Sequence, residues 1–241
     1  ACRLFGWMSG SQNGVLAGKV RFNDAVAEKV VTHGAVYTKV LSNPKPHHKA
    51  WYLDPDEQKV AGRKYYFHQS DIQTATDWIL SRAPANRRLN QYICPLGSGS
   101  IFHSTLTFFN LTEEEEWPLL LYAMFLEDTM AHKLGYAKPL GFGSVKIEPV
   151  KLRLINLVNR YSFEERENVS EEEGKIFEEA RLVRYLQKKT ARYREDEESI
   201  VLNQLRQVWA WPPVLQNYAY PSRDWFNDNS QAPITATITA T

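Results

Sequence analysis

The chain has 241 residues, of which 43% are hydrophobic, and its formal net charge at pH 7 is +1. This length and apolar content allow one large domain or two small ones. No apolar run approaches the roughly 18 residues that a membrane span requires, so we expect no membrane partner. The N-terminus lacks the layout of a signal peptide, so we expect a cytoplasmic protein. Because the chain begins with Ala1 and continues directly into "CRLFGW", we expect it to be a piece of a longer protein.

Charge and cysteine content leave the class of partner open. A near-neutral total neither favours nor excludes nucleic acid, because it can conceal one basic face. Cys2 and Cys94 lie far apart in the sequence. They cannot form a disulfide framework, nor a four-ligand zinc site made by this chain alone.

The N-terminal half is predicted to consist mainly of strands, with one long surface loop between them, which we call the excursion. In the segment 14–28, alternating apolar residues predict a partly buried strand that ends at Asn23 and Asp24, where the aspartate is a local cap or, alternatively, a catalytic acid. The excursion covers about 42–90 and holds a short strand at 63–69 and a short helix from Asp71. A strand over 99–111 follows, with both faces covered.

The C-terminal half begins with the clearest helix signal in the chain. Thr112 can cap the N–H of Glu115, glutamates fill the first turn, and Gly135 ends the helix after Lys133. Strand pairing should then slip at Pro149 and leave a basic outer face. An acidic segment over 162–175 ends in a capping box from Ser170. One helix is then predicted to run to about residue 190, and its buried residues should be Ile176, Phe177, Ala180, Val183 and Leu186. A second helix is predicted near 199–211, and its buried residues should be Val201, Leu205 and Val208.

This order of elements predicts an α+β fold with a split βαβ, ferredoxin-like sheet and helices on one side. We divide the chain into a core over 1–160 that contains the excursion, a helical extension over 161–226, and a flexible tail over 227–241.

The segment "HKLGYAKPLGFGSVKI", residues 132–147, is the strongest candidate for a binding site. Dinucleotide and P-loop motifs leave a strand and enter a helix, whereas this segment should leave a helix and enter a strand. Bare backbone, amines and aromatic rings together suit the backbone and bases of RNA. The alternative is that the glycines only form a helix C-cap and a tight turn. The predicted RNA-binding residues are Arg63, Lys64, Lys133, Gly135, Tyr136, Lys138, Gly141, Phe142, Gly143, Ser144 and Lys146.

Catalytic and metal signals are weak. The six histidines form no set with metal-ligand spacing. His68 and His103 are candidate general bases for RNA cleavage, without an identifiable partner acid. Ser98 lies in a sequence that favours a turn over a nucleophile elbow. No catalytic residue is assigned, and we expect a binding protein more than an enzyme.

Several segments in this order resemble the RAMP superfamily of CRISPR-associated proteins. They are "CRLFGW", "GVLAGKVRFNDA", "GRKYYFHQ", "FHSTLTFFNLTEEE" and the glycine segment. The likeness is strongest to backbone subunits of type III effector complexes, particularly the III-D and III-E branches. It runs from Cys2 to about Ile155 and, more loosely, over 208–226.

The resemblance implies an RRM-like core, here its carboxy-terminal part, that binds guide crRNA beside other Cas backbone subunits and presents it to target RNA in an antiviral ribonucleoprotein. The family's glycine-rich positions match Gly135, Lys138, Gly141, Gly143 and Ser144; its opening motif matches Leu4, Phe5 and Gly6; and Asp24 matches a family aspartate.

Two departures from the family pattern limit what carries over. Relatives can bind zinc through a cysteine cluster, of which this chain retains Cys2, so any structural zinc would need ligands outside this sequence. The loop aspartate of target-cleaving relatives is not visible here. The resemblance therefore implies a structural, guide-RNA-binding subunit; the alternative is a RAMP-type endoribonuclease that matures guide RNA with His68 or His103 as the base.

Overall fold

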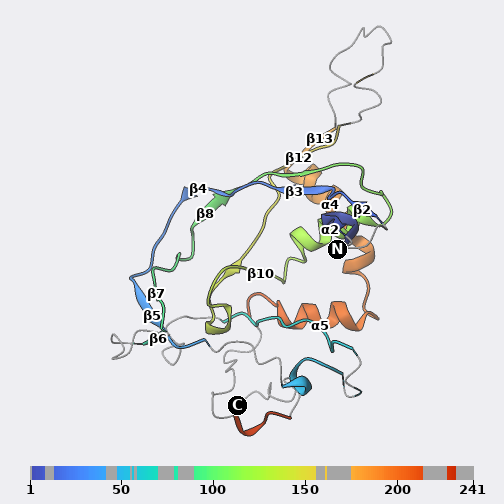
Figure 1. Ribbon diagram of the computed structural model, residues 1–241. Coiled ribbons are helices and arrows are strands. Elements are labelled where there is room, and N and C mark those ends of the chain that lie inside the picture. The colour runs from blue at the N-terminus through green and yellow to red at the C-terminus, as the bar shows by residue number, and fades with distance from the viewer. Residues whose placement is uncertain are drawn as a thin grey trace. The chain divides into compact units, whose positions relative to one another are not determined.

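The computed structural model describes residues 2–8, 14–41, 48–54, 56, 59–69, 79–80, 90–155, 161, 175–213 and 227–231. Helices and short strands are mixed along this part of the chain, as the α+β prediction requires (Figure 1). The helices are α1 (Cys2–Phe5), α2 (Glu116–Phe125), α4 (Glu179–Arg194) and α5 (Ile200–Val208), with 3-10 turns η1 (Lys49–Trp51) and η3 (Lys138–Leu140). Within these ranges, no helix is both long and apolar enough to span a bilayer.

The described strands pair in small sheets. The strands are β1 (Trp7–Met8), β2 (Val15–Leu16), β3 (Val20–Phe22), β4 (Val26–Lys29), β5 (Val36–Thr38), β6 (Ile79–Leu80), β7 (Tyr92–Ile93), β8 (Ile101–His103), β9 (Leu106–Phe108), β10 (His132–Lys133), β11 (Ser144–Val145), β12 (Lys151–Arg153) and β13 (Ile176–Glu178). The pairs are β1–β2, β3–β9, β4–β8, β10–β11 and β12–β13, and β5 lies between β6 and β7.

The chain forms two compact units, each assembled from separated segments. The first contains residues 1–21, 107–127 and 147–202, and the second contains 22–106, 128–146 and 203–241. These bounds differ from the predicted division at about residue 160. The chain passes between the two units several times. The amino-acid composition does not change at these crossing points, so the sequence does not reveal them.

The strand predicted to end at Asn23 and Asp24 is present as two short pieces, β2 and β3. β3 and β4 are separated at Asn23, whose N–H donates to the Thr105 carbonyl at 3.0 Å. β4 pairs with β8 as a two-stranded ribbon (Figure 1). The prediction that both faces of 99–111 are covered is wrong, because the side chains of β8 are exposed, as are those of β4.

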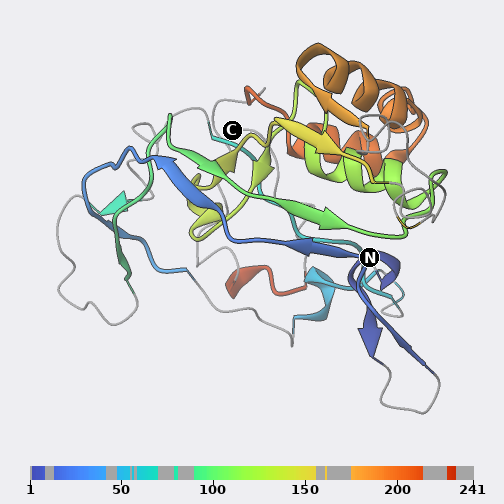
Figure 2. The ribbon, with the colours of Figure 1, turned by 90° about the horizontal axis from the view of Figure 1, so that it is seen from above.

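Helix α2 is the core of the first unit and packs beside α4 (Figure 2). Trp117, Leu120 and Leu121 are buried, and Trp117 donates its Nε1–H to the hydroxyl of Tyr185 on α4 at 2.9 Å. The predicted apolar stripe is therefore confirmed at these positions. The helix ends at Phe125, however, and not near Gly135, because residues 130–133 pair instead with 209–211 and with β11.

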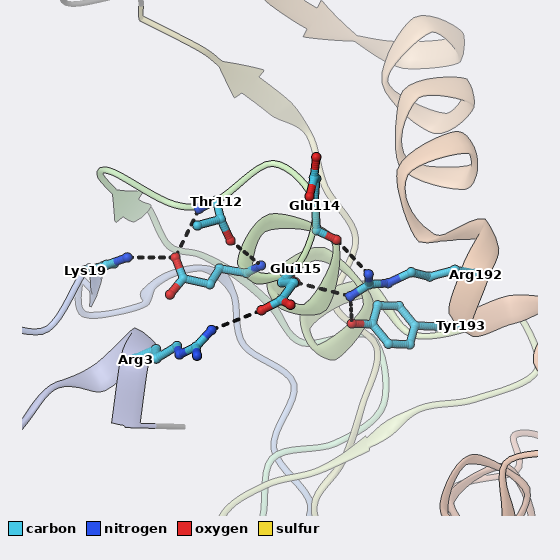
Figure 3. A network of polar contacts seen from close by, with 8 residues as sticks. Arg3, Lys19, Thr112, Glu114, Glu115, Arg192 and Tyr193 are labelled. Atoms are coloured by element: carbon cyan, nitrogen blue, oxygen red, sulfur yellow. Dashed lines mark hydrogen bonds and ion pairs between the residues drawn. The ribbon is translucent and has the colours of Figure 1, made fainter.

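The start of α2 is fixed by the polar network drawn in Figure 3. The Thr112 hydroxyl accepts the N–H of Glu116 at 3.1 Å, and the Glu116 carboxylate accepts the N–H of Thr112 at 3.0 Å. This reciprocal cap involves the residue after the one predicted. Lys19 Nζ lies 2.7 Å from the same carboxylate, and its hydrogen bond is the main reason that the Glu116 pKa is lowered.

The C-terminal helices begin later than predicted. Ile176 and Phe177 belong to β13, which pairs with β12, and α4 starts at Glu179. Leu182 and Leu186 are buried on α4, whereas Val183 is 50% exposed. The predicted inward set was therefore wrong in part, because the strand shifts the start of the helical period. Val201, expected to point inward from α5, is exposed.

Other predictions concern the excursion, the acidic segment and the tail, of which the structure describes only part. The predicted strand at 63–69 is wrong, since residues 61–69 form no strand. Of the helix predicted from Asp71, only Ile79 and Leu80 are described, and they form β6. The capping box from Ser170 lies outside the described ranges, as does the tail except for residues 227–231.

The break at Pro149 is confirmed as a change of partner, because β11 pairs with β10 and β12 pairs with β13.

Candidate nucleic-acid interface

The glycine segment connects two antiparallel strands of the second unit. β10 pairs with β11 in a register that places His132 opposite Val145 and Lys133 opposite Ser144. The prediction that the segment leaves a helix is therefore wrong, since it leaves β10. It still enters a strand and not a helix, so it lacks the helix N-terminus with which dinucleotide and P-loop motifs hold phosphate.

One side of the segment forms part of a hydrophobic core. Ala137, Leu140 and Phe142 are buried together, and partly buried side chains from other segments pack against them. These side chains are Val36, Leu41 and Ile93. Phe142, predicted as an RNA contact, therefore faces protein in this structure. Burial of an aromatic ring with aliphatic neighbours stabilises the loop through the hydrophobic effect.

Lys133 is buried beneath the loop and holds it closed. Its side chain is 7% exposed, and Nζ donates to the carbonyls of Gly141 and Phe142, each at 2.8 Å. Loss of hydration is the main cause that lowers the pKa of Lys133 to about 8, and the positive charge of Lys138 adds to it. Lys133 was predicted to contact RNA, whereas in this structure its amine donates hydrogen bonds to two backbone carbonyls.

The three glycines of the segment differ in what surrounds them. All three have positive φ, a region that favours glycine. A Cβ on Gly143 would lie 1.9 Å from the Leu134 carbonyl oxygen, and one on Gly141 would lie 2.9 Å from Cγ of Gln69. A Cβ on Gly135 would meet nothing within 4 Å. Gly141 and Gly143 are therefore required by packing, while Gly135 leaves open backbone.

The other side of the segment is exposed. It consists of Leu134, Gly135 and Tyr136, whose side chain is 52% exposed. Lys138 donates from Nζ to the Gly135 carbonyl at 2.8 Å, which fixes this part of the backbone. Lys146 is exposed just after β11. We call residues 134–136, Lys138 and Lys146 the exposed ridge.

His68 lies against this loop and is 1% exposed. Its Nε2 is 2.9 Å from the Ala131 carbonyl, and its Nδ1 is 2.8 Å from the Ser144 hydroxyl. Because a carbonyl only accepts, Nε2 carries the proton, and Nδ1 accepts from Ser144. Burial is the main cause that lowers the pKa of His68 to about 4. Both nitrogens are occupied, so His68 is not positioned to act as a base on RNA, and Ser144 is engaged with it.

The segment that carries Arg63 and Lys64 also lies in the second unit. Both side chains are exposed, and Lys64 Nζ lies 5.2 Å from the centre of the Tyr66 ring. Further along, His68 contacts the glycine segment through Ser144, and Gln69 approaches Gly141. The fold therefore brings the two predicted RNA-binding stretches, distant in sequence, into one unit.

Two tryptophans complete this region and were not predicted as part of it. Trp209 packs edge-on against Tyr65 and lies 5.4 Å from the His132 ring, and Trp211 packs edge-on against His68. The backbone of 209–211 also bonds to residues 129–131. The alternating tryptophans in "VWAWPP" were the available signal, because a bulky residue at every second position is typical of an extended segment against a core.

The remaining candidates stay apart from this region. His103 is exposed on β8 and hydrogen-bonds to Glu28 on β4. Asp24 lies in the turn between β3 and β4, and Cys2 is exposed at the start of α1. Across the described ranges, no three His, Cys, Asp or Glu side chains gather in a way that could hold a metal ion.

The chain matches no known protein family and no curated protein sequence.

Proposed function

We propose that this chain is a guide-RNA-binding structural subunit of a type III CRISPR interference complex. Its exposed ridge would contact the RNA backbone and a base, and its neighbours would be other Cas backbone subunits and target RNA. The order of the motifs that resemble the RAMP superfamily supports this proposal, and so does the mixed α+β content. An RRM-like core, a cytoplasmic location and a structural zinc completed by ligands outside this chain belong to the same proposal.

The observation that carries the proposal is the division of the glycine segment into a buried and an exposed side. Lys133, Phe142, Gly141 and Gly143 serve the loop's own packing. Open backbone at Gly135, the half-exposed Tyr136 ring and Lys146 remain available to a ligand. A ring stacks on any base, and an amine neutralises a phosphate, so this ridge fits an RNA strand without sequence preference.

The test replaces the exposed ridge and leaves the buried side intact. Tyr136→Ala should weaken binding of single-stranded RNA by about 1–3 kcal/mol, the usual contribution of one stacked base. Lys146→Gln should lower the slope of log affinity against log salt by about 0.7. Fluorescence anisotropy over a salt series measures both effects. Lys59→Gln, an exposed lysine on the turn between Leu53 and Val60, is the control and should change neither.

Unchanged binding in Tyr136→Ala and Lys146→Gln, with normal unfolding curves, would exclude the ridge as an RNA contact. Gly141→Val with Gly143→Val would be a less suitable pair of substitutions for this purpose. The 1.9 Å approach of a Cβ on Gly143 to a carbonyl makes that double variant a test of folding instead.

A specific contact supports the alternative, an endoribonuclease. His103 is exposed and paired with Glu28, and a carboxylate that orients an imidazole is a common arrangement for a general base. Incubating repeat RNA with the parent chain and with His103→Ala, and analysing the RNA for cleavage products, decides between the two functions. Cleavage that disappears in His103→Ala would favour the enzyme.

A further inference from the structure

Positive charge is concentrated on helix α4. The helix carries six Lys or Arg residues and one Glu over 16 residues, whereas the whole chain has a net charge of only +1. The near-neutral total of the chain therefore conceals one strongly basic element. A helix with this charge either neutralises acidic protein groups or presents its charge to a partner.

Three of the six cations are used by the first unit itself. Lys189 lies 3.6 Å from the Glu113 carboxylate, Arg192 donates to the Glu114 carbonyl at 2.6 Å, and Arg194 donates to the Leu126 carbonyl at 2.6 Å. These contacts tie α4 to the segment around α2, and Figure 3 shows the one between Arg192 and Glu114. They account for the basic residues that border the buried face of the helix.

The other three cations, Arg181, Arg184 and Lys188, form an exposed row. They are spaced at i, i+3 and i+7, which places them on one face of the helix over about 10 Å. Among the residues that the structure describes, none of the three is paired with a carboxylate: Arg184 donates to the Ala180 carbonyl within its own helix, and Arg181 lies over the Phe177 ring. We call this set the α4 basic row.

The chemistry of the row fits a nucleic-acid strand. Lysine and arginine side chains neutralise the phosphates of a strand, and each such contact adds to the salt dependence of binding. A single guanidinium group can also donate two parallel hydrogen bonds to the oxygens of one phosphate. The Phe177 ring lies 4.3 Å from the Tyr185 ring, and both are partly exposed beside the row. Aromatic faces next to cations favour a strand with unstacked bases over an acidic polypeptide, which needs no stacking surface.

We propose that Arg181, Arg184 and Lys188 on α4 bind the phosphate backbone of single-stranded RNA. This second contact surface belongs to the first unit and goes beyond the function proposed for the exposed ridge, which belongs to the second. It does not depend on that ridge, since a strand can engage either surface alone.

The experiment uses the full chain and oligouridine over 50–200 mM salt. Arg184→Gln with Lys188→Gln removes two phosphate contacts, so the salt slope should fall by about 1.4, and the affinity difference between parent and variant should shrink about sevenfold across this range. Lys189→Gln removes one positive charge from the same helix at a lysine that is paired with Glu113, and it should keep the parent slope; it is the charge-matched control for a single substitution in the row. Arg181→Gln, alone, should lower the slope by about 0.7.

An unchanged slope in both Arg184→Gln with Lys188→Gln and Arg181→Gln would overturn the proposal. Competition by polyglutamate as strong as that by RNA would overturn it in favour of an acidic protein partner. The positions are exposed, so thermal unfolding should match that of the parent chain; if the double variant unfolds, Arg181→Gln carries the test. Repeating the titration in Tyr136→Ala separates the two surfaces, because the slope change from α4 should persist there.

Discussion

His68 illustrates how one buried side chain can couple three segments. Its two nitrogens bond to Ala131 and Ser144, and its ring packs on Trp211. A neutral imidazole suits this place, because it donates to a carbonyl on one side and accepts from a hydroxyl on the other. Protonation would put a second donor against Ser144 and a charge into a site shielded from water.

Acid should therefore weaken the fold through His68. Its pKa is about 4 in the folded chain and about 6.5 when unfolded. The unfolded chain binds more protons between these values, so the contribution of His68 to stability is complete above pH 6.5 and is lost as pH falls toward 4. The loss at pH 4 should be on the order of 2–3 kcal/mol. Urea unfolding at pH 7, 5 and 4 measures it.

His68→Gln should remove this part of the pH dependence, whatever it does to stability at pH 7. His103→Gln changes an exposed histidine on β8 and is the matched control, which should keep the parent's fall in stability. An identical pH profile for His68→Gln and the parent chain would show that the buried imidazole is not the group responsible.

At the scale of the element, α2 depends on contacts before its first turn. The Thr112 hydroxyl satisfies a backbone donor, and the Glu116 carboxylate returns a bond to Thr112 while pairing with Lys19. Glu115 also pairs with Arg3 at 3.0 Å, but both side chains are exposed, so that ion pair adds little. The start of the helix is thus set mainly by the reciprocal cap.

Thr112→Ala should lower the free energy of unfolding by about 0.5–2 kcal/mol, the range for loss of a helix cap. Thr107→Ala removes the same hydroxyl from an exposed position on β9 and should cost less than about 0.5 kcal/mol. Denaturant unfolding of the two variants makes the comparison. Equal effects would mean that the Thr112 hydroxyl contributes no more than an ordinary surface threonine.

At the scale of the whole molecule, the units interleave along the chain. The first unit combines residues 1–21 with 107–127 and 147–202. The apolar stripe of α2 is completed by α4 through Leu182, Leu186 and the contact of Trp117 with Tyr185. A cut near residue 160, which the domain prediction suggests, separates these partners.

A fragment of residues 1–160 should therefore lose the cooperative unfolding of the full chain. Without α4, the side chains of Trp117, Leu120 and Leu121 lose buried contacts, and exposing each large apolar side chain costs about 1.5–3 kcal/mol. Binding of a hydrophobic dye and near-UV circular dichroism would detect the change. Cooperative unfolding of the fragment at the midpoint of the full chain would contradict this expectation.

Local signals in the sequence account for part of this structure. The mixed α+β class, the capping of α2 by Thr112, and the breaks at Asn23 and Pro149 were all predictable. Each depends on residues within a few positions of one another, because capping, turn formation and the loss of a proline N–H are local effects. The 3.6-residue period likewise identified buried positions of α2.

Only the tertiary structure decided which way the glycine segment faces. Lys133 and Phe142 turn inward, and Tyr136 turns outward. The partners that produce this arrangement lie at 36–41, 68–69, 93 and 209–211, far away in the sequence. Burial depends on where these distant segments meet, and the local pattern of lysines, aromatics and glycines is the same whichever side meets water.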